Sequence, residues 1–308
     1  MKTAAWMLAG LCCAAACGLS HAAAPKTIGA FGVPSEPQRV DWSRDGAMAF
    51  SADDGILVWE EGREPRRLTK PDTLAPRWSP DGTRLAFLEF VREVKPWGEE
   101  DHYALAVTGR DGGHAGTLVD PAGDSFTWSG ESTLVLQAEG GIEELDVRSA
   151  AKRRVGDGKP LSALVGCSGG GAFAVESAAG LALYDARSLR LVRTIVLPKE
   201  AGYSQCASAD DVWAADNGGT VYHYARDGRR DVALGGLPRG TSMDPAGARL
   251  AVAVLGKGLF LVEAGGDVRK LDDGDDSAPS FSADGRRLAF WRRIGDHRCE
   301  LLVMDVEG

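Results

Sequence analysis

The segment from Gly166 to Gly170 has the residue types of a nucleophilic serine motif. It reads Gly-Cys-Ser-Gly-Gly, which matches the Gly-x-Ser-x-Gly pattern that exposes a serine for acyl transfer. That chemistry needs a sharp strand-to-helix turn, with a carboxylate and a histidine further along the chain. Ser168 aligns instead with Ser79 of a repeated hairpin turn, in which Gly-Gly replaces Asp-Gly. We therefore assign no catalytic residue from the linear sequence.

Cysteine pairing is the second candidate chemistry. Cys167 and Cys206 occupy the place that Trp78 fills in another repeat, so they are either two small buried side chains or a disulfide. A disulfide requires Cα atoms within about 7 Å, and we expect equivalent positions of neighbouring repeats to be further apart. Cys299 is expected to be a single buried or reactive thiol. No Cys-x-x-Cys or Cys/His cluster supports a metal site.

An acidic segment at 272–276 places four carboxylates in five residues. Carboxylate oxygens are ligands for Ca²⁺, but the spacing does not fit an EF-hand loop. We therefore expect a solvated acidic loop, with no metal and no cofactor.

A non-repeating insertion from Phe90 to His102 combines Trp97 with charged residues. We expect it to join the second and third strands of its repeat, on the face where the chain enters each blade. Trp is enriched at binding hot spots, so Trp97 and His102 are candidate partner contacts. The alternative is a decorated loop with its Trp folded back. Further candidates lie near the starts of inner strands: Arg39, Arg77 and Arg239.

The elements that position these residues belong to an internal repeat. Segment 78–87 reads Trp-Ser-Pro-Asp-Gly-Thr-Arg-Leu-Ala-Phe and returns at 281–290 as Phe-Ser-Ala-Asp-Gly-Arg-Arg-Leu-Ala-Phe. Looser copies bring the anchor residues to seven, at 42, 78, 128, 167, 206, 243 and 281. Successive anchors are 36, 50, 39, 39, 37 and 38 residues apart. Such a fixed period indicates a repeat architecture.

Each repeat predicts four short strands. The Asp-Gly turn is a strong hairpin signal, and an apolar strand with a central Ala follows it. A third and a fourth strand come later in each repeat, and helical periodicity is absent after the N-terminal segment. Four strands about every 40 residues predict an all-β, seven-bladed β-propeller with four-stranded antiparallel blades. We assign 23–308 to this single domain.

The two ends of the chain predict how the ring closes. The last repeat ends after its third strand, and a strand-like piece at 27–31 precedes the first anchor. We expect this N-terminal strand to join the last blade as its outer strand.

At its anchors the sequence resembles the TolB-type, WD-like propeller repeat. Segments 75–82 and 278–285 carry the fuller pattern, including the Pro two residues before the anchor, and Val303-Met304-Asp305 is also typical. The resemblance implies the propeller fold and says little about function. TolB itself has an N-terminal α/β domain for which the residues before the first anchor leave no room, so its envelope-translocation role is not implied.

The first residues resemble a secretory signal peptide. Lys2 precedes an apolar, Ala-rich run, and small residues follow it. We expect residues 1–22 to be a signal peptide cleaved after Ala22, and a lipoprotein at Cys17 is the minor alternative. The protein would then be periplasmic or secreted.

The charge balance narrows the classes of partner. Without Lys2, 34 Lys and Arg face 44 Asp and Glu. An acidic chain without a basic stripe argues against nucleic acid, and no later apolar run is long enough for a transmembrane span. We expect a monomer.

Two functions from different classes remain open at this point. The first is a non-catalytic scaffold that binds a protein, peptide or envelope component through its channel face. The second is a saccharide or peptide lyase or hydrolase, with a site assembled across blades at the channel mouth. Three or more titratable groups within reach of one point would favour the enzyme.

Overall fold

The computed structural model describes residues 24–33, 37–96, 98–113, 116–138, 141–155, 163–168, 171–177, 180–198 and 201–306. These residues form seven four-stranded antiparallel sheets and no helix. The predicted all-β, seven-bladed propeller is therefore confirmed. Within the same ranges, no helix is long and apolar enough to cross a membrane.

The first three blades follow one another from the first anchor. Blade 1 comprises β2 (Asp41–Trp42), β3 (Met48–Ala52), β4 (Gly55–Trp59) and β5 (Arg66–Arg67). Blade 2 comprises β6 (Thr73–Trp78), β7 (Arg84–Lys95), β8 (Gly98–Gly109) and β9 (Gly116–Ala122). Blade 3 comprises β10 (Phe126–Trp128), β11 (Thr133–Ala138), β12 (Gly141–Asp146) and β13 (Lys152–Val155).

The remaining blades continue around the ring. Blade 4 comprises β14 (Ala163–Gly166), β15 (Ala172–Ser177), β16 (Gly180–Asp185) and β17 (Leu191–Ile195). Blade 5 comprises β18 (Ala201–Ser208), β19 (Asp211–Asp216), β20 (Thr220–Ala225) and β21 (Gly228–Ala233). Blade 6 comprises β22 (Pro238–Met243), β23 (Arg249–Val254), β24 (Gly258–Glu263) and β25 (Val268–Asp272). Blade 7 comprises β26 (Asp276–Phe281), β27 (Arg287–Gly295), β28 (Arg298–Asp305) and β1 (Lys26–Gly32).

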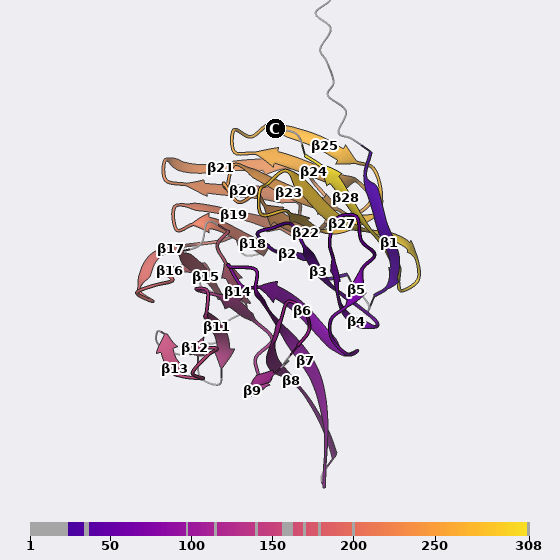
Figure 1. The fold of residues 1–308 in the computed structure, drawn as a ribbon. Helices are drawn as coiled ribbons and strands as arrows, with labels where there is room; N and C mark the ends of the chain where they lie inside the picture. The colour runs from indigo at the N-terminus through magenta and orange to yellow at the C-terminus, as the bar shows by residue number, and fades with distance from the viewer. Residues whose placement is uncertain are drawn as a thin grey trace, which may run out of the picture.

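The N-terminal strand β1 is the outer strand of blade 7, as the chain ends predict. It pairs antiparallel with β28, from Lys26 opposite Val303 to Gly32 opposite Arg298. Figure 1 shows the two ends of the ring meeting at this pair. Phe31 also makes edge-on contacts with Phe50 of blade 1, with ring centroids 5.0 Å apart. The first strand therefore links blade 7 to blade 1.

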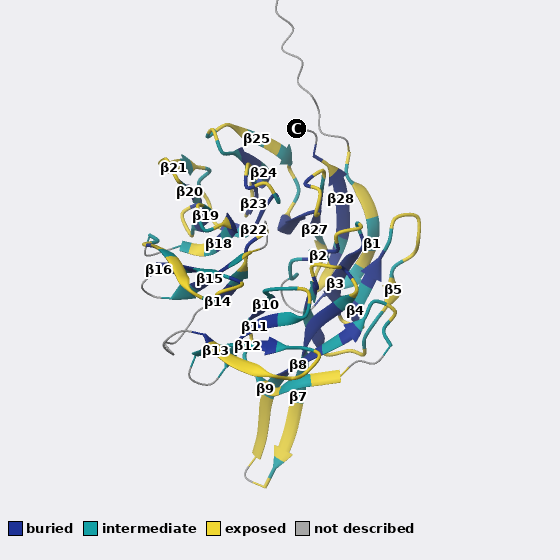
Figure 2. Ribbon diagram, turned by 60° about the vertical axis from the view of Figure 1, so that its left-hand side comes forward, coloured by how far each residue is buried: buried dark blue, intermediate teal, exposed yellow. Residues whose placement is uncertain are grey.

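The apolar core lies between the blades. Each of the seven buried clusters combines side chains of two neighbouring sheets, and together they run around the ring (Figure 2). The second strand of most blades places a small residue at this interface, where neighbouring sheets converge. Five such alanines are fully buried: Ala49, Ala86, Ala174, Ala251 and Ala289.

The repeated turn is held by its serine and aspartate. In blade 2, the Ser79 hydroxyl donates to Asp81 at 2.5 Å and accepts the backbone N–H of Arg84 at 3.0 Å. Gly82 has a φ of +70°, a conformation that glycine adopts without a Cβ clash. The Ser79 hydrogen bond holds the pKa of Asp81 below its usual value. The same Ser–Asp bond recurs in blades 1 and 7.

Basic residues six positions after the anchor join neighbouring blades. The Arg287 guanidinium lies over the ring of Trp42 in the next blade, 5.0 Å from its centroid, and Arg249 lies over Phe281 at 5.5 Å. The Trp42 indole N–H also donates to the Ser280 carbonyl of blade 7 at 3.1 Å. The anchor aromatics and the arginines of the repeat therefore hold adjacent blades together.

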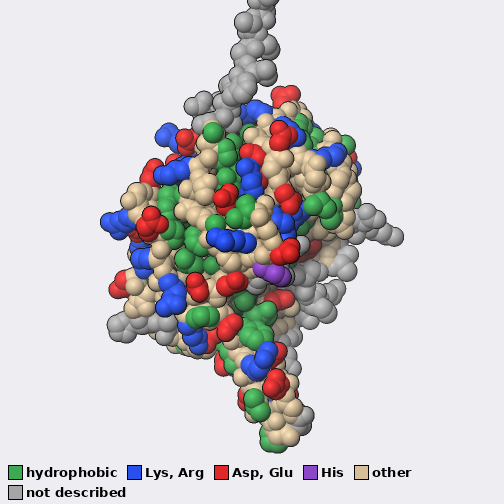
Figure 3. Space-filling model, turned by 90° about the vertical axis from the view of Figure 1, so that its right-hand side faces the viewer, with side chains coloured by type: hydrophobic (Ala, Val, Ile, Leu, Met, Phe, Trp, Pro, Cys, Tyr) green, Lys and Arg blue, Asp and Glu red, His purple; other side chains and the backbone are tan. Residues whose placement is uncertain are grey.

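The insertion forms a long two-stranded hairpin rather than a loop. Strands β7 and β8 pair from Arg84 opposite Gly109 to Lys95 opposite Gly98. Figures 1 and 3 show this hairpin projecting away from the ring, and its surface carries charges of both signs. The expected connection between second and third strands is therefore observed.

Candidate functional site

A cavity of about 630 Å³ occupies the central channel. The inner strands form a closed ring of contacts around it: β2, β6, β10, β14, β18, β22 and β26. Side chains from all seven blades line the cavity, among them Trp42, Trp78 and Trp128. The anchor residues that line the channel are thus apolar, and polar side chains line it at other positions of the inner strands.

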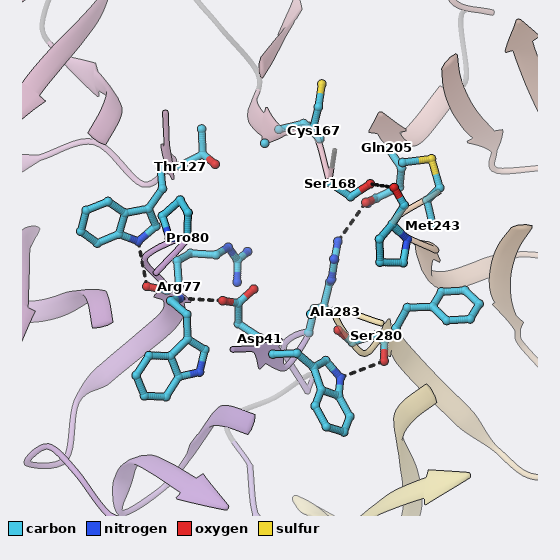
Figure 4. A pocket seen from close by; sticks show the side chains of 18 of the residues that line it. Asp41, Arg77, Pro80, Thr127, Cys167, Ser168, Gln205, Met243, Ser280 and Ala283 are labelled. Atoms are coloured by element: carbon cyan, nitrogen blue, oxygen red, sulfur yellow. Dashed lines mark hydrogen bonds between the residues drawn. The ribbon is translucent and has the colours of Figure 1, made fainter. Parts of the chain in front are cut away.

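In five of the seven blades, a polar residue immediately before the anchor lines the cavity. Figure 4 shows Asp41, Arg77, Thr127, Gln205 and Ser280 around the cavity. Each stands one position before its blade's anchor, so the strand's alternation turns it away from the core and into the channel.

Three charged side chains meet at this centre. The Arg39 guanidinium donates to the Gln205 side-chain oxygen at 2.9 Å, across the channel from blade 1 to blade 5. The Asp41 carboxylate accepts the backbone N–H of Trp78 at 2.6 Å. Arg77 donates to the carbonyl of its neighbour Pro76 at 2.9 Å. In the described part of the chain, no carboxylate lies within ion-pair distance of Arg39 or Arg77.

The protein environment of the channel shifts the pKa values of two of these groups, Arg39 and Asp41. Burial and, to a lesser extent, the nearby Arg77 charge lower the pKa of Arg39 to about 10, against the opposing influence of Asp41. Burial raises the pKa of Asp41, against the opposing influence of Arg77 and the Trp78 N–H. Both side chains keep some exposure to the solvent inside the channel. Arg39 remains a cation at neutral pH.

The two ends of the channel differ. One end is formed by the repeated turns and is lined by Pro80, Ser168, Pro245 and Ala283. At the other end a second cavity of about 420 Å³ is lined by Leu74, Tyr103 and Asp124, among others. Arg39 and Arg77 line both cavities and therefore stand between the two ends.

Cys167 and Cys206 form a disulfide with a Cα–Cα distance of 4.6 Å. Of the two alternatives left open by the sequence, the disulfide is observed. The expectation that equivalent positions of neighbouring blades lie further apart was wrong here, because the inner strands of blades 4 and 5 approach closely at this end. The Ser168 N–H donates to the Cys206 carbonyl at 2.8 Å, which shows the same approach. Cys299 is a free, buried thiol, and burial raises its pKa.

Ser168 lies at the mouth of the cavity without a catalytic partner. Its hydroxyl reaches the carbonyls of Asp244 and Pro245 at 3.5 Å. None of the histidines in the described ranges lines the cavity. His223, for example, bonds Asp211 at 2.9 Å and stacks on Trp213.

The predicted partner contacts do not all meet at the channel. Arg39 and Arg77 line it, whereas Arg239 donates to Asp275 at 2.7 Å and does not. His102 lies on β8 and contacts Asp120 at 2.6 Å, outside both cavities. Trp97 lies outside the described residues.

The acidic segment is bound by arginines rather than solvated throughout. Arg292 bonds Asp276 at 2.9 Å and also bonds Asp272, while Arg239 holds Asp275. Among the described residues, no group of three or more His, Cys, Asp or Glu is placed to hold a metal ion.

Arg39 and Arg77 were predicted from the sequence as candidate channel residues. Asp41, Thr127, Gln205 and Ser280 were not, although the repeat contains the signal that marks them. Their common place immediately before the anchor would have identified them together with Arg77.

Comparisons with known proteins support the fold and leave the family open. No protein-family model matches the sequence, and no curated protein does. Among solved structures, 1259 chains match, so the fold is too widespread to indicate a function. One comes from the "Crystal Structure of Mitotic Checkpoint Complex"; the match is 15% identical with a TM-score of 0.67, and covers 100% of this chain and 99% of that chain. This likeness shows the fold alone, and the TolB-type resemblance stays a prediction.

Proposed function

We propose that this protein is a non-catalytic propeller that binds a protein, peptide or envelope component through its channel face. The cavity lined by all seven blades carries the proposal, since one bound segment would contact every blade. Its lining of aromatic anchors with a few polar groups is typical of ligand sites. The solved neighbour belongs to a structure of a protein complex, which adds only an analogy of fold.

We also propose that the protein works outside the cytoplasm, after cleavage following Ala22. The signal-like segment 1–22 supports this, and so does the disulfide between Cys167 and Cys206. Disulfides form and persist in oxidising compartments such as the bacterial periplasm.

The channel proposal is tested by narrowing the mouth. Ala283 is exposed and lines the cavity, so Ala283→Trp places a large ring there without disturbing the core. The matched control is Ala151→Trp, at an exposed position in blade 3 that lines neither cavity. Both variants and the wild type are applied to an array of synthetic peptides of diverse composition.

We expect Ala283→Trp to lose most of the peptides that the wild type retains, and Ala151→Trp to keep them. Equal retention by all three proteins, or none by the wild type, would contradict the proposal. A Trp97→Ala variant on the same array tests whether this residue adds a second contact, in which case fewer peptides are retained.

One observation favours the enzyme as a second candidate. Arg39, Asp41 and Arg77 are three titratable groups that meet in the channel, and the pKa of Asp41 is raised. Perturbed carboxylates in cavities are candidates for proton transfer. The test is whether the wild type turns over a saccharide or peptide. If it does, and if Asp41→Asn abolishes turnover but retains binding, the protein is a lyase or hydrolase and the scaffold proposal is wrong.

A further inference from the structure

The channel centre differs from the rest of the molecule in how its arginines are paired. Elsewhere, weakly exposed arginines bind carboxylates: Arg249 holds Asp244 at 2.9 Å, and Arg239 holds Asp275 at 2.7 Å. Arg39 and Arg77 have no carboxylate at ion-pair distance among the described residues. Two cations therefore lie together, without direct pairing, inside an acidic protein.

Asp41 does not neutralise this pair. It supplies one negative charge against two positive charges, and one of its two carboxylate oxygens accepts the Trp78 N–H at 2.6 Å. The charge of Arg77 disfavours protonation of Arg39, which shows that the two guanidinium groups repel each other. The centre thus keeps an excess positive charge.

The two arginines also keep free donors. A guanidinium carries five N–H donors in a planar fork, and one hydrogen bond is described for each, from Arg39 to Gln205 and from Arg77 to Pro76. The bond to Gln205 fixes Arg39 across the channel, so its position does not depend on a ligand. Both side chains line the cavity of about 630 Å³, which is large enough for a ligand segment.

We propose that Arg39 and Arg77 form an oxyanion site at the centre of the channel, which receives a carboxylate of the bound peptide. This inference rests on the proposed function and names the chemistry that its ligand must carry. Guanidinium groups bind carboxylate and phosphate oxygens through charge-assisted hydrogen bonds. One such anion would offset the charge that Asp41 leaves uncompensated.

The test titrates sodium acetate and sodium phosphate into the full protein at constant ionic strength, with sodium chloride as the reference salt. Trp42, Trp78 and Trp128 line the cavity, so intrinsic tryptophan fluorescence reports binding there. We expect a saturable change with acetate or phosphate that chloride does not give. A response to phosphate without any response to acetate would contradict the assignment to a carboxylate.

Two variants should shift this binding in opposite directions. Arg77→Gln removes one cation and should weaken binding roughly tenfold or more, because a hydrogen bond to a charged group is lost. Asp41→Asn removes the repelling charge and keeps an oxygen for the Trp78 N–H, so binding should tighten several-fold. Arg239→Gln is the control, since Arg239 is bound to Asp275 and does not line the cavity.

Tighter anion binding by Asp41→Asn cannot arise from misfolding. This variant therefore still tests the site if Arg77→Gln fails to fold. The absence of any saturable response in the wild type would overturn the site, as would unchanged binding in Arg77→Gln or weaker binding in Asp41→Asn. If the expected anion-binding results are not obtained but Ala283→Trp still loses the peptides that the wild type retains, the scaffold proposal stands and only the oxyanion site fails.

Discussion

Asp276 has no exposed side-chain surface, although its carboxylate bonds Arg292. Burial raises the pKa of this carboxyl to about 6, against the opposing influence of Arg292. Between its ordinary value of 3.8 and about 6, the folded protein therefore holds a proton that the unfolded chain releases. This contribution to stability is complete below pH 3.8 and is lost as the pH rises through about 6.

In the Asp276→Asn variant, the free energy of unfolding should lack this dependence on pH. From pH 4 to pH 7 the free energy of unfolding of the wild type should fall relative to that of the variant by on the order of 2 kcal/mol. Urea unfolding at several pH values measures this difference. Asp273→Asn, at a neighbouring side chain that is 88% exposed, is the matched control. Parallel pH curves for wild type and Asp276→Asn would show that the carboxyl is not perturbed.

Residue positions were predictable wherever the repeat defines them. Ser79, Asp81 and Gly82 build the turn that their types imply, because the serine and aspartate bond each other across it. The contact between Arg39 and Gln205 was not predictable, since it joins blades 1 and 5 across the channel. A repeat shows which position lines a channel, but not which of its side chains meet.

At the level of elements, blades 4 and 5 are joined covalently. The bond between Cys167 and Cys206 closes a loop with a sequence separation of 39 residues, which restricts the unfolded chain. Replacing both cysteines with serine should lower the free energy of unfolding by about 3 kcal/mol. Dithiothreitol should destabilise the wild type by a similar amount and leave the double variant unchanged.

Denaturant unfolding with and without reductant measures this effect. A Cys299→Ala variant should respond to reductant as the wild type does, since Cys299 is a free thiol. If the free energy of unfolding of the wild type is the same with and without reductant, the disulfide has no stabilising role.

The positions of the strands along the chain could be predicted from the sequence, but the distances between strands of neighbouring blades could not. The anchors and the central alanines predicted where strands occur, because a hairpin turn and a small residue recur in most blades. The approach of β14 to β18 did not follow, since the period along the chain says nothing of the distance between neighbouring inner strands. The insertion was recognised, and its pairing as an extended β7–β8 hairpin was not.

At the level of the whole molecule, stability depends on closing the ring. Strand β1 pairs with β28, and Phe31 contacts both Phe50 and Trp291, with the second pair of ring centroids 6.1 Å apart. A chain beginning at Pro37 would lose these contacts and leave β28 as an open edge. Exposed edge strands pair with other chains, so the shortened protein should associate or aggregate as well as melt earlier.

We expect the chain that begins at Pro37 to melt about 10 °C or more below one that begins at Ala24, since a partly buried aromatic side chain and a strand ladder are lost. Thermal unfolding followed by circular dichroism measures the difference, and light scattering measures the association. A synthetic peptide of residues 24–33 should restore part of the stability, because it can pair with β28 in the place of β1. Equal melting temperatures for the two chains would mean that the other six blades hold the ring without this strand, and the peptide would then have no effect.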